Sequence, residues 1–253
     1  MAILTRENYT TAIKSWAEVK SNYSEIQNVL SPEQVFILTR EQIEWFDKEN
    51  EEETYFRADI GVWENKLALI LTPRDSAGAV KTLDNYEYAP LQFLESDLTL
   101  KQTKTYTVTS TYTLTKDLSK GKEDSDIDFP IMDKPVTGQL KAVDEIESWK
   151  ENAMDYLQRE SLEFKGQRIF QSFYIPKADL LHDKEKMHDV VCVFGFKYSE
   201  VYQRLLATII FVSNELGAKI GTPGAVYAVQ SDPSNTYDWS KPCPPYCIPT
   251  PAP

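Results

Sequence analysis

The chain of 253 residues is long enough for one large or two ordinary domains, and its 42% apolar residues suffice for a hydrophobic core. Its formal net charge of −12 repels phosphate backbones and anionic lipid, which argues against nucleic acid and membrane surfaces as partners. The N-terminus lacks the basic and apolar regions of a signal peptide, and no apolar stretch could span a bilayer, so we expect a cytoplasmic protein.

Residues 1–116 are expected to form a first α+β repeat. Apolar residues recur at helical spacing from Arg6 to about Lys20. The apolar run Val35–Leu38 predicts a buried strand; a helix that starts at the capping box 31–34 is the alternative, but its periodicity is poorer. Thr39 opens a second capping box and a short helix. Strands are expected over 55–63 and 66–72, on either side of a turn.

A long threonine-rich β segment is expected at Thr103–Thr115. Tyr106, Val108, Tyr112 and Leu114 alternate there with threonines, and β-branched and aromatic residues at period two are typical of a strand. One row of threonines is too few for an ice-binding face. A strand of this kind presents an edge that can pair with another chain.

The second half repeats this order. Residues 117–142, rich in Gly, Lys, Asp, Ser and Pro, are expected to be a linker without regular structure up to Leu140. Residues 143–230 are expected to form a second α+β repeat and residues 231–253 a Pro-rich tail. The repeat is expected to hold an amphipathic helix around Trp149, a strand at 169–175, a short helix after Pro176 and strands near 190–196 and 202–212.

Short matches in the same order support an internal duplication. Each half reads helix, strand, short helix, strand, strand, so the expected fold class is α+β with mixed or antiparallel sheets. Two generic α+β segments whose apolar runs align easily are the alternative. The matching segments are 13–16 with 146–149, 36–40 with 173–177, 60–62 with 194–196, and 67–71 with 206–210.

The second half also resembles a known family. The resemblance rests on the segments 173–180, 192–196, 209–212 and 237–238 and on the tail Cys243-Pro244-Pro245-Tyr246-Cys247. Taken together, they resemble a family of uncharacterised bacterial proteins with a strand–helix–strand core and a C-terminal Cys-Pro-Pro-x-Cys tail. The resemblance covers about residues 143–248 and implies the fold but no activity. Members are single-copy, so the N-terminal half is a departure.

No catalytic motif stands out. The chain lacks a Gly-rich phosphate loop and a nucleophile elbow, so we expect no catalytic residue and no cofactor. Cys243, Cys247, His182 and His188 are a set that zinc accepts, although the spacing of the histidines is slightly too wide. Free thiols on a tail stiffened by proline are the preferred interpretation, and a Cys243–Cys247 disulfide is the alternative if the protein leaves the cytoplasm. Cys192 is expected to be a buried, inert thiol.

Two functions remain open. The first is a non-enzymatic structural or interaction protein that binds itself or another protein, with pairing of β edges as the proposed mode of self-assembly. The alternative is a small-molecule-binding domain or enzyme with a pocket between the halves. Five aromatic residues could line that pocket, although residues of this kind are more often core: Trp16, Trp45, Trp63, Trp149 and Tyr202.

Overall fold

The computed structural model describes residues 2–50, 54–98, 100, 107–114, 120–128, 139–180, 188–213, 236–237 and 240–246. The fold is α+β, as expected. Its helices are α1 (Arg6–Val19), α2 (Tyr23–Val29), α3 (Arg40–Glu49), α4 (Gln139–Phe164) and α5 (Lys177–Leu180). The strands of the first half are β1 (Ile3–Thr5), β2 (Phe36–Leu38), β3 (Tyr55–Trp63), β4 (Lys66–Thr72), β5 (Asn85–Pro90) and β6 (Thr107–Leu114). Those that follow are β7 (Lys120–Asp128), β8 (Ser172–Pro176), β9 (Val190–Ser199), β10 (Arg204–Ser213), β11 (Thr236–Tyr237) and β12 (Lys241–Cys243).

Local signals set most of these boundaries. The Thr5 side chain caps α1 by accepting from Asn8 N at 3.3 Å. Thr39 and Gln42 form a capping box at the start of α3, which confirms β2 as a strand and excludes the longer helix. Glu64 and Asn65 both have positive φ, at 51° and 60°, which suits the tight turn between β3 and β4.

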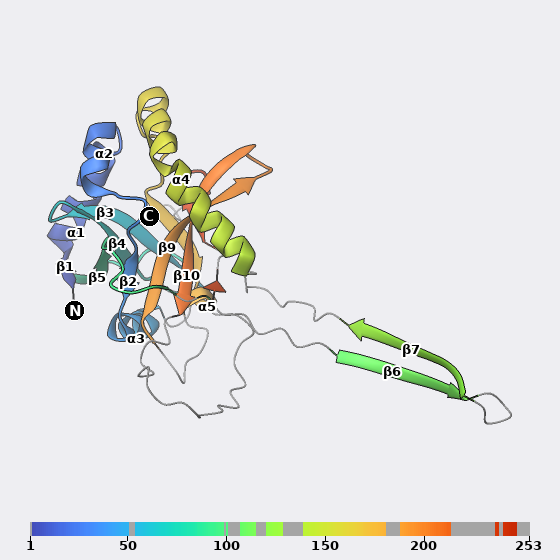
Figure 1. Cartoon of the computed structure of the whole chain (residues 1–253). Coiled ribbons are helices and arrows are strands. Elements are labelled where there is room, and N and C mark those ends of the chain that lie inside the picture. Colours follow the sequence, from blue (N-terminus) through green and yellow to red (C-terminus); the bar gives the residue numbers. More distant parts are fainter. Residues whose placement is uncertain are drawn as a thin grey trace.

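The two repeats exchange one strand each. One sheet has the order β1-β5-β4-β3-β8-β12 and another has the order β11-β10-β9-β2, and all pairs are antiparallel. Thus β2 of the first repeat lies beside β9 of the second, and β8 of the second lies beside β3 of the first (Figure 1). The repeats are therefore interlocked and share one hydrophobic core.

The strand registers support the duplication independently of sequence matches. Phe36 pairs with Cys192, and its aligned residue Phe173 pairs with Ala58, which is aligned with Cys192. The pair β2–β9 and the pair β8–β3 therefore have the same register. Since a slip of one residue would turn every side chain to the opposite face, this agreement is specific.

Two glycines mark the same helix contact in each repeat. A Cβ on Gly61 would lie 2.9 Å from Ala12 Cβ and 3.0 Å from Ile70 Cδ1. A Cβ on Gly195 would lie 2.9 Å from Ile210 Cδ1 and 3.4 Å from Glu145 Cβ. Glycine therefore lets α1 approach β3, and α4 approach β9, at equivalent positions.

This geometry corrects the alignment of the last strand. Gly61 pairs with Ala68, and Gly195 pairs with Thr208. Ala68 therefore corresponds to Thr208, one residue beyond the expected match with Ala207. The loop between β9 and β10 is longer than the turn between β3 and β4, and a continuous apolar run does not specify its own register.

The central core lies where the repeats meet. Trp16 and Trp149 are both buried, and both rings contact Phe170, at centroid distances of 5.9 and 6.2 Å. Trp149 also stacks on Phe194 at 4.7 Å. The tryptophans thus occupy the equivalent core positions expected from the sequence.

Some elements were not foreseen. The expectation of an irregular segment up to Leu140 is wrong, because β7 lies there and α4 begins at Gln139. β6 confirms a strand within the threonine-rich segment, and its partner is β7 in a separate two-stranded sheet. Figure 1 shows this hairpin apart from the two larger sheets. β1 and β5 were also missed.

Within the described ranges, no helix is both long and apolar enough to cross a membrane.

Candidate functional site

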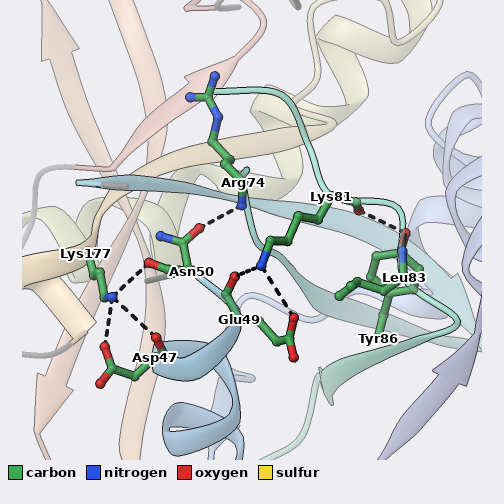
Figure 2. A network of polar contacts seen from close by, with 8 residues as sticks. All are labelled: Asp47, Glu49, Asn50, Arg74, Lys81, Leu83, Tyr86 and Lys177. Carbon is green, nitrogen blue, oxygen red and sulfur yellow. Dashed lines mark hydrogen bonds and ion pairs between the residues drawn. The ribbon is translucent and has the colours of Figure 1, made fainter. Parts of the chain in front are cut away.

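A polar network surrounds the C-terminal end of α3 (Figure 2). Lys177 Nζ lies 2.8 Å from Asp47 Oδ1 and donates to Asn50 O, also at 2.8 Å. Lys81 Nζ donates to Glu49 O, and Arg74 N donates to the buried Asn50 Oδ1 at 2.7 Å. Two cations from distant elements thus satisfy carbonyls at the negative end of the helix dipole, which is a structural arrangement.

We expect Lys177→Met to lower the free energy of unfolding by about 2 kcal/mol, because it removes charge-assisted hydrogen bonds from a largely buried ammonium group. Chemical denaturation monitored by circular dichroism measures this change. Lys48→Met is the control, since Lys48 is exposed in the last turn of the same helix. Equal losses in both variants would contradict a specific role for Lys177.

A second polar cluster lies between α1 and β3. Tyr9 OH donates to Asp59 Oδ2 at 2.7 Å, and Arg57 Nη2 donates to the same oxygen at 2.8 Å. Burial and the Asp59 carboxylate raise the pKa of Tyr9 above its ordinary value. The aligned residues of the second repeat form part of an apolar cluster: Ala142, Val191 and Val193. The contact between helix and strand at this position is therefore polar in the first repeat and apolar in the second.

A cavity of about 360 Å³ lies between β9, β10 and the segment 240–246. A serine side chain binds the edge of β10 that faces away from β9. Ile209 N donates to Ser240 Oγ at 2.7 Å, and Ser240 Oγ donates to Ile209 O at 3.1 Å. In the first repeat the aligned residue Leu69 pairs directly with Ala89. The hydroxyl of Ser240 thus stands where a neighbouring strand would otherwise pair.

The cavity lining combines lysines, hydroxyl groups and aromatic rings. Its residues are Lys197, Tyr198, Ser199, Leu206, Ala207, Thr208, Ser240, Lys241, Pro242 and Tyr246. Its described residues include two lysines and no acidic residue, in a chain with a net charge of −12. Ser199 Oγ and Tyr246 OH lie 3.4 Å apart, and Tyr202 meets the Tyr246 ring edge-on at 5.2 Å. We take this cavity as the candidate binding site.

The residues that zinc could use are only partly described. Cys243 is disulfide-bonded, so the expectation of a free thiol is wrong there, and a disulfide sulfur is not the thiolate that zinc requires. His188 is partly buried, while His182 and Cys247 lie outside the described residues. Among the described residues, no group of three or more metal-binding side chains occurs. Cys192 is a free, buried thiol as expected, and burial raises its pKa.

The expected aromatic pocket residues divide between core and surface. Trp16 and Trp149 belong to the central core, and Trp45 packs against it. Trp63 packs against a separate apolar cluster that contains Ala68 and Ile70. Tyr202 lies near the observed cavity through its contact with Tyr246. This cavity is lined by the second repeat and the C-terminal segment, and so does not lie between the halves. Sequence reasoning missed Ser240 and Lys241, because only the folded chain brings the segment 240–246 close to β10.

No match was found in the comparisons with known proteins: no family model, no curated protein and no solved structure is significantly similar to this chain. The resemblance to a family with a Cys-Pro-Pro-x-Cys tail therefore stays a prediction. In the described structure, Cys243 of that motif ends β12 and joins the sheet through β8. Fold and cavity geometry are thus the basis for any functional conclusion.

Proposed function

We propose that the protein is a non-enzymatic interaction protein that self-associates through the open edge of β6. The observation that carries the proposal is the β6–β7 hairpin, which forms a two-stranded sheet of its own. β7 pairs with one edge of β6, and no described strand pairs with the other. The partner is a second copy of this chain, which adds its own β6 in antiparallel orientation.

An isolated two-stranded hairpin is at best marginally stable in water. Three or more strands, or packing against another element, are needed for independent stability. Figure 1 shows the hairpin without such packing among the described elements. Pairing with a second copy would supply the missing strands and make a four-stranded sheet of order β7-β6-β6-β7.

The charges of the two strands favour β6 as the pairing edge. The sequence of β6 contains no charged residue, proline or glycine over its eight residues. β7 contains Glu123, Asp124, Asp126 and Asp128, and charged strands resist pairing at an edge. In the proposed sheet the acidic strands lie three strand spacings apart, roughly 14 Å. That exceeds the screening length of about 8 Å at physiological salt, so their repulsion is weak.

We expect the wild type to be a dimer and Val108→Lys/Ser110→Lys to be a monomer, because lysines on both copies of β6 repel across the new pair. These two positions lie opposite Ile127 and Ser125 of β7, so no acidic side chain directly across the hairpin neutralises them. Multi-angle light scattering at several protein concentrations measures the molar mass. The control, Leu162→Lys/Val201→Lys, changes charge equally at positions with exposed fractions of 71% and 80% outside the hairpin, and should remain dimeric.

Two outcomes would overturn the proposal. A wild type that stays monomeric at the highest accessible concentration has no self-association to explain. A dimer that persists in the β6 lysine variant uses another surface. Circular dichroism of both variants should match the wild type, which separates loss of pairing from loss of folding.

The cytoplasmic location expected from the sequence stays a prediction. Disulfides persist mainly in oxidising compartments and are rare in the cytosol. The disulfide at Cys243 therefore argues against that location. The proposed self-association does not depend on the compartment, because β6 pairs through its backbone.

A further inference from the structure

We infer that the cavity between β9, β10 and the segment 240–246 binds a secondary amide with an apolar side group, the chemistry of a leucine-like residue in a short extended peptide. This binding site goes beyond the proposed self-association and uses other residues. The inference follows from a comparison of the two repeats. At one position the first repeat has a backbone hydrogen bond, and the second repeat has a proline and a cavity.

The segment beside β10 can be aligned with β5 of the first repeat through its contacts. Two pairs in each repeat fix the alignment, and both lie three residues apart in the segment: Leu69–Ala89 with Ile209–Ser240, and Val35–Gln92 with Ser172–Cys243. Leu91 of the first repeat therefore corresponds to Pro242 of the second.

This correspondence identifies a hydrogen bond that the second repeat cannot make. Leu91 N donates to Leu67 O at 2.7 Å. Ala207 is the residue aligned with Leu67, and Pro242 is the residue aligned with Leu91. Proline has no N–H group, so the equivalent hydrogen bond cannot form. Ala207 and Pro242 both line the cavity, so the open space coincides with the position of the missing donor.

The carbonyl of Ala207 lies on the edge of β10 that borders the cavity. Ile209 N donates to Ser240 Oγ and Ile209 O accepts from it, so both backbone groups of Ile209 point away from β9. Backbone groups of alternate residues in a strand point to the same side, and β9 and β10 pair without a register shift. Ala207 O therefore also points away from β9. Ala207 is buried, and a buried carbonyl favours a hydrogen-bond donor.

Other groups of the lining suit the rest of an amide. Ser199 Oγ and Tyr246 OH lie 3.4 Å apart, and a hydroxyl group can donate to the carbonyl oxygen of the ligand. Leu206, Ala207 and Pro242 are buried apolar residues, against which an apolar side group gains burial. One residue of an extended peptide supplies the N–H, the carbonyl and the apolar side chain together.

The size of the cavity limits the length of the ligand. Its volume of about 360 Å³ lies at the lower end of the range for ligand pockets. A single amino acid with both ends blocked is therefore a suitable probe. We choose N-acetyl-L-leucine methyl ester, because it is uncharged, carries one N–H and has the side chain that Leu91 has in the first repeat.

Isothermal titration calorimetry should show saturable binding of this probe to the full chain. The analogue with a methyl group on the leucine nitrogen should bind about tenfold more weakly, the upper range for one hydrogen bond, because it lacks the N–H that Ala207 O accepts. Both ligands have the same side chain and the same carbonyl groups, so the comparison isolates the donor.

Pro242→Leu should weaken binding of the probe by tenfold or more, because the added N–H can donate to Ala207 O as that of Leu91 does to Leu67 O. Pro32→Leu makes the same exchange in a turn outside the described lining and should bind as the wild type does. Circular dichroism of both variants checks that they are folded.

Three results would overturn the inference. They are a probe that does not bind saturably, an N-methyl analogue that binds as well as the probe, and a folded Pro242→Leu variant with wild-type affinity. If Pro242→Leu does not fold, the comparison of the two ligands on the wild type decides. The β6 variant Val108→Lys/Ser110→Lys should keep wild-type affinity for the probe, so failure of self-association and failure of binding are distinguishable.

Discussion

Trp16→Ala is expected to lower the free energy of unfolding by about 3–5 kcal/mol, the usual cost of truncating a buried tryptophan. Trp16 has an exposed fraction of 0% and lies where α1 meets Phe170 of the second repeat. Its Nε1 donates to Phe170 O at 2.8 Å, so truncation also leaves a buried carbonyl without that donor. Urea denaturation followed by circular dichroism measures the change.

Trp149→Ala provides the internal comparison. Trp149 is 1% exposed and contacts Phe170, Phe194 and Phe196, but its Nε1 has no hydrogen-bond partner among the described residues. We therefore expect a loss smaller than that of Trp16→Ala by about 1 kcal/mol. Phe93→Ala, at a position with an exposed fraction of 59%, should change stability little. Small shifts in both tryptophan variants would contradict a shared core at Phe170.

Local chemistry made much of the fold predictable. The capping box at Thr39 separated β2 from α3, and helical spacing around Trp16 and Trp149 located the two long helices. The matching order of elements predicted the duplication before any contact was known. These features depend on residues close in sequence, where capping and periodicity act directly.

The sequence did not predict that β2 and β8 each pair with a strand of the other repeat. β2 and β8 are short apolar runs, and either could pair with any exposed strand edge of the protein. Their partners, β9 and β3, are far away in sequence, so the pairs form only when the two repeats come together around the shared core at Phe170. β5 did carry a signal, since its tyrosines 86 and 88 alternate with other residues, but it is short.

The candidate site was harder to predict than the fold. Lys197 and Lys241 are remote in sequence and become neighbours of one cavity only through β10. Ser240 belongs to a segment whose composition indicated only a Pro-rich tail. A serine that binds a strand edge in place of another strand has no sequence motif, because its role depends on its position beside Ile209 in the folded chain. The acidic character of β7 was visible, but its pairing with β6 was not foreseen.

The second large expected change in stability comes from Gly166, where the C-terminal ends of α1 and α4 meet. Gly166→Ala is expected to lower the free energy of unfolding by about 3 kcal/mol, from left-handed backbone strain together with steric overlap. Gly166 has φ of +70°, and its N donates to Glu160 O at 3.0 Å in the manner of a helix C-cap. A Cβ at this position would overlap with Lys20 O, which is backbone and cannot move aside as a side chain can.

Gly78→Ala separates the two contributions. Gly78 also has positive φ, at +79°, but the heavy atom nearest to an added Cβ is Arg74 Nη2, at 3.4 Å. Only the backbone cost should remain, about 1 kcal/mol. Both variants are compared by their urea midpoints at equal m-values. If Gly166→Ala costs no more than Gly78→Ala, then α1 and α4 do not approach each other as closely as the structure places them, because the overlap with Lys20 would be absent.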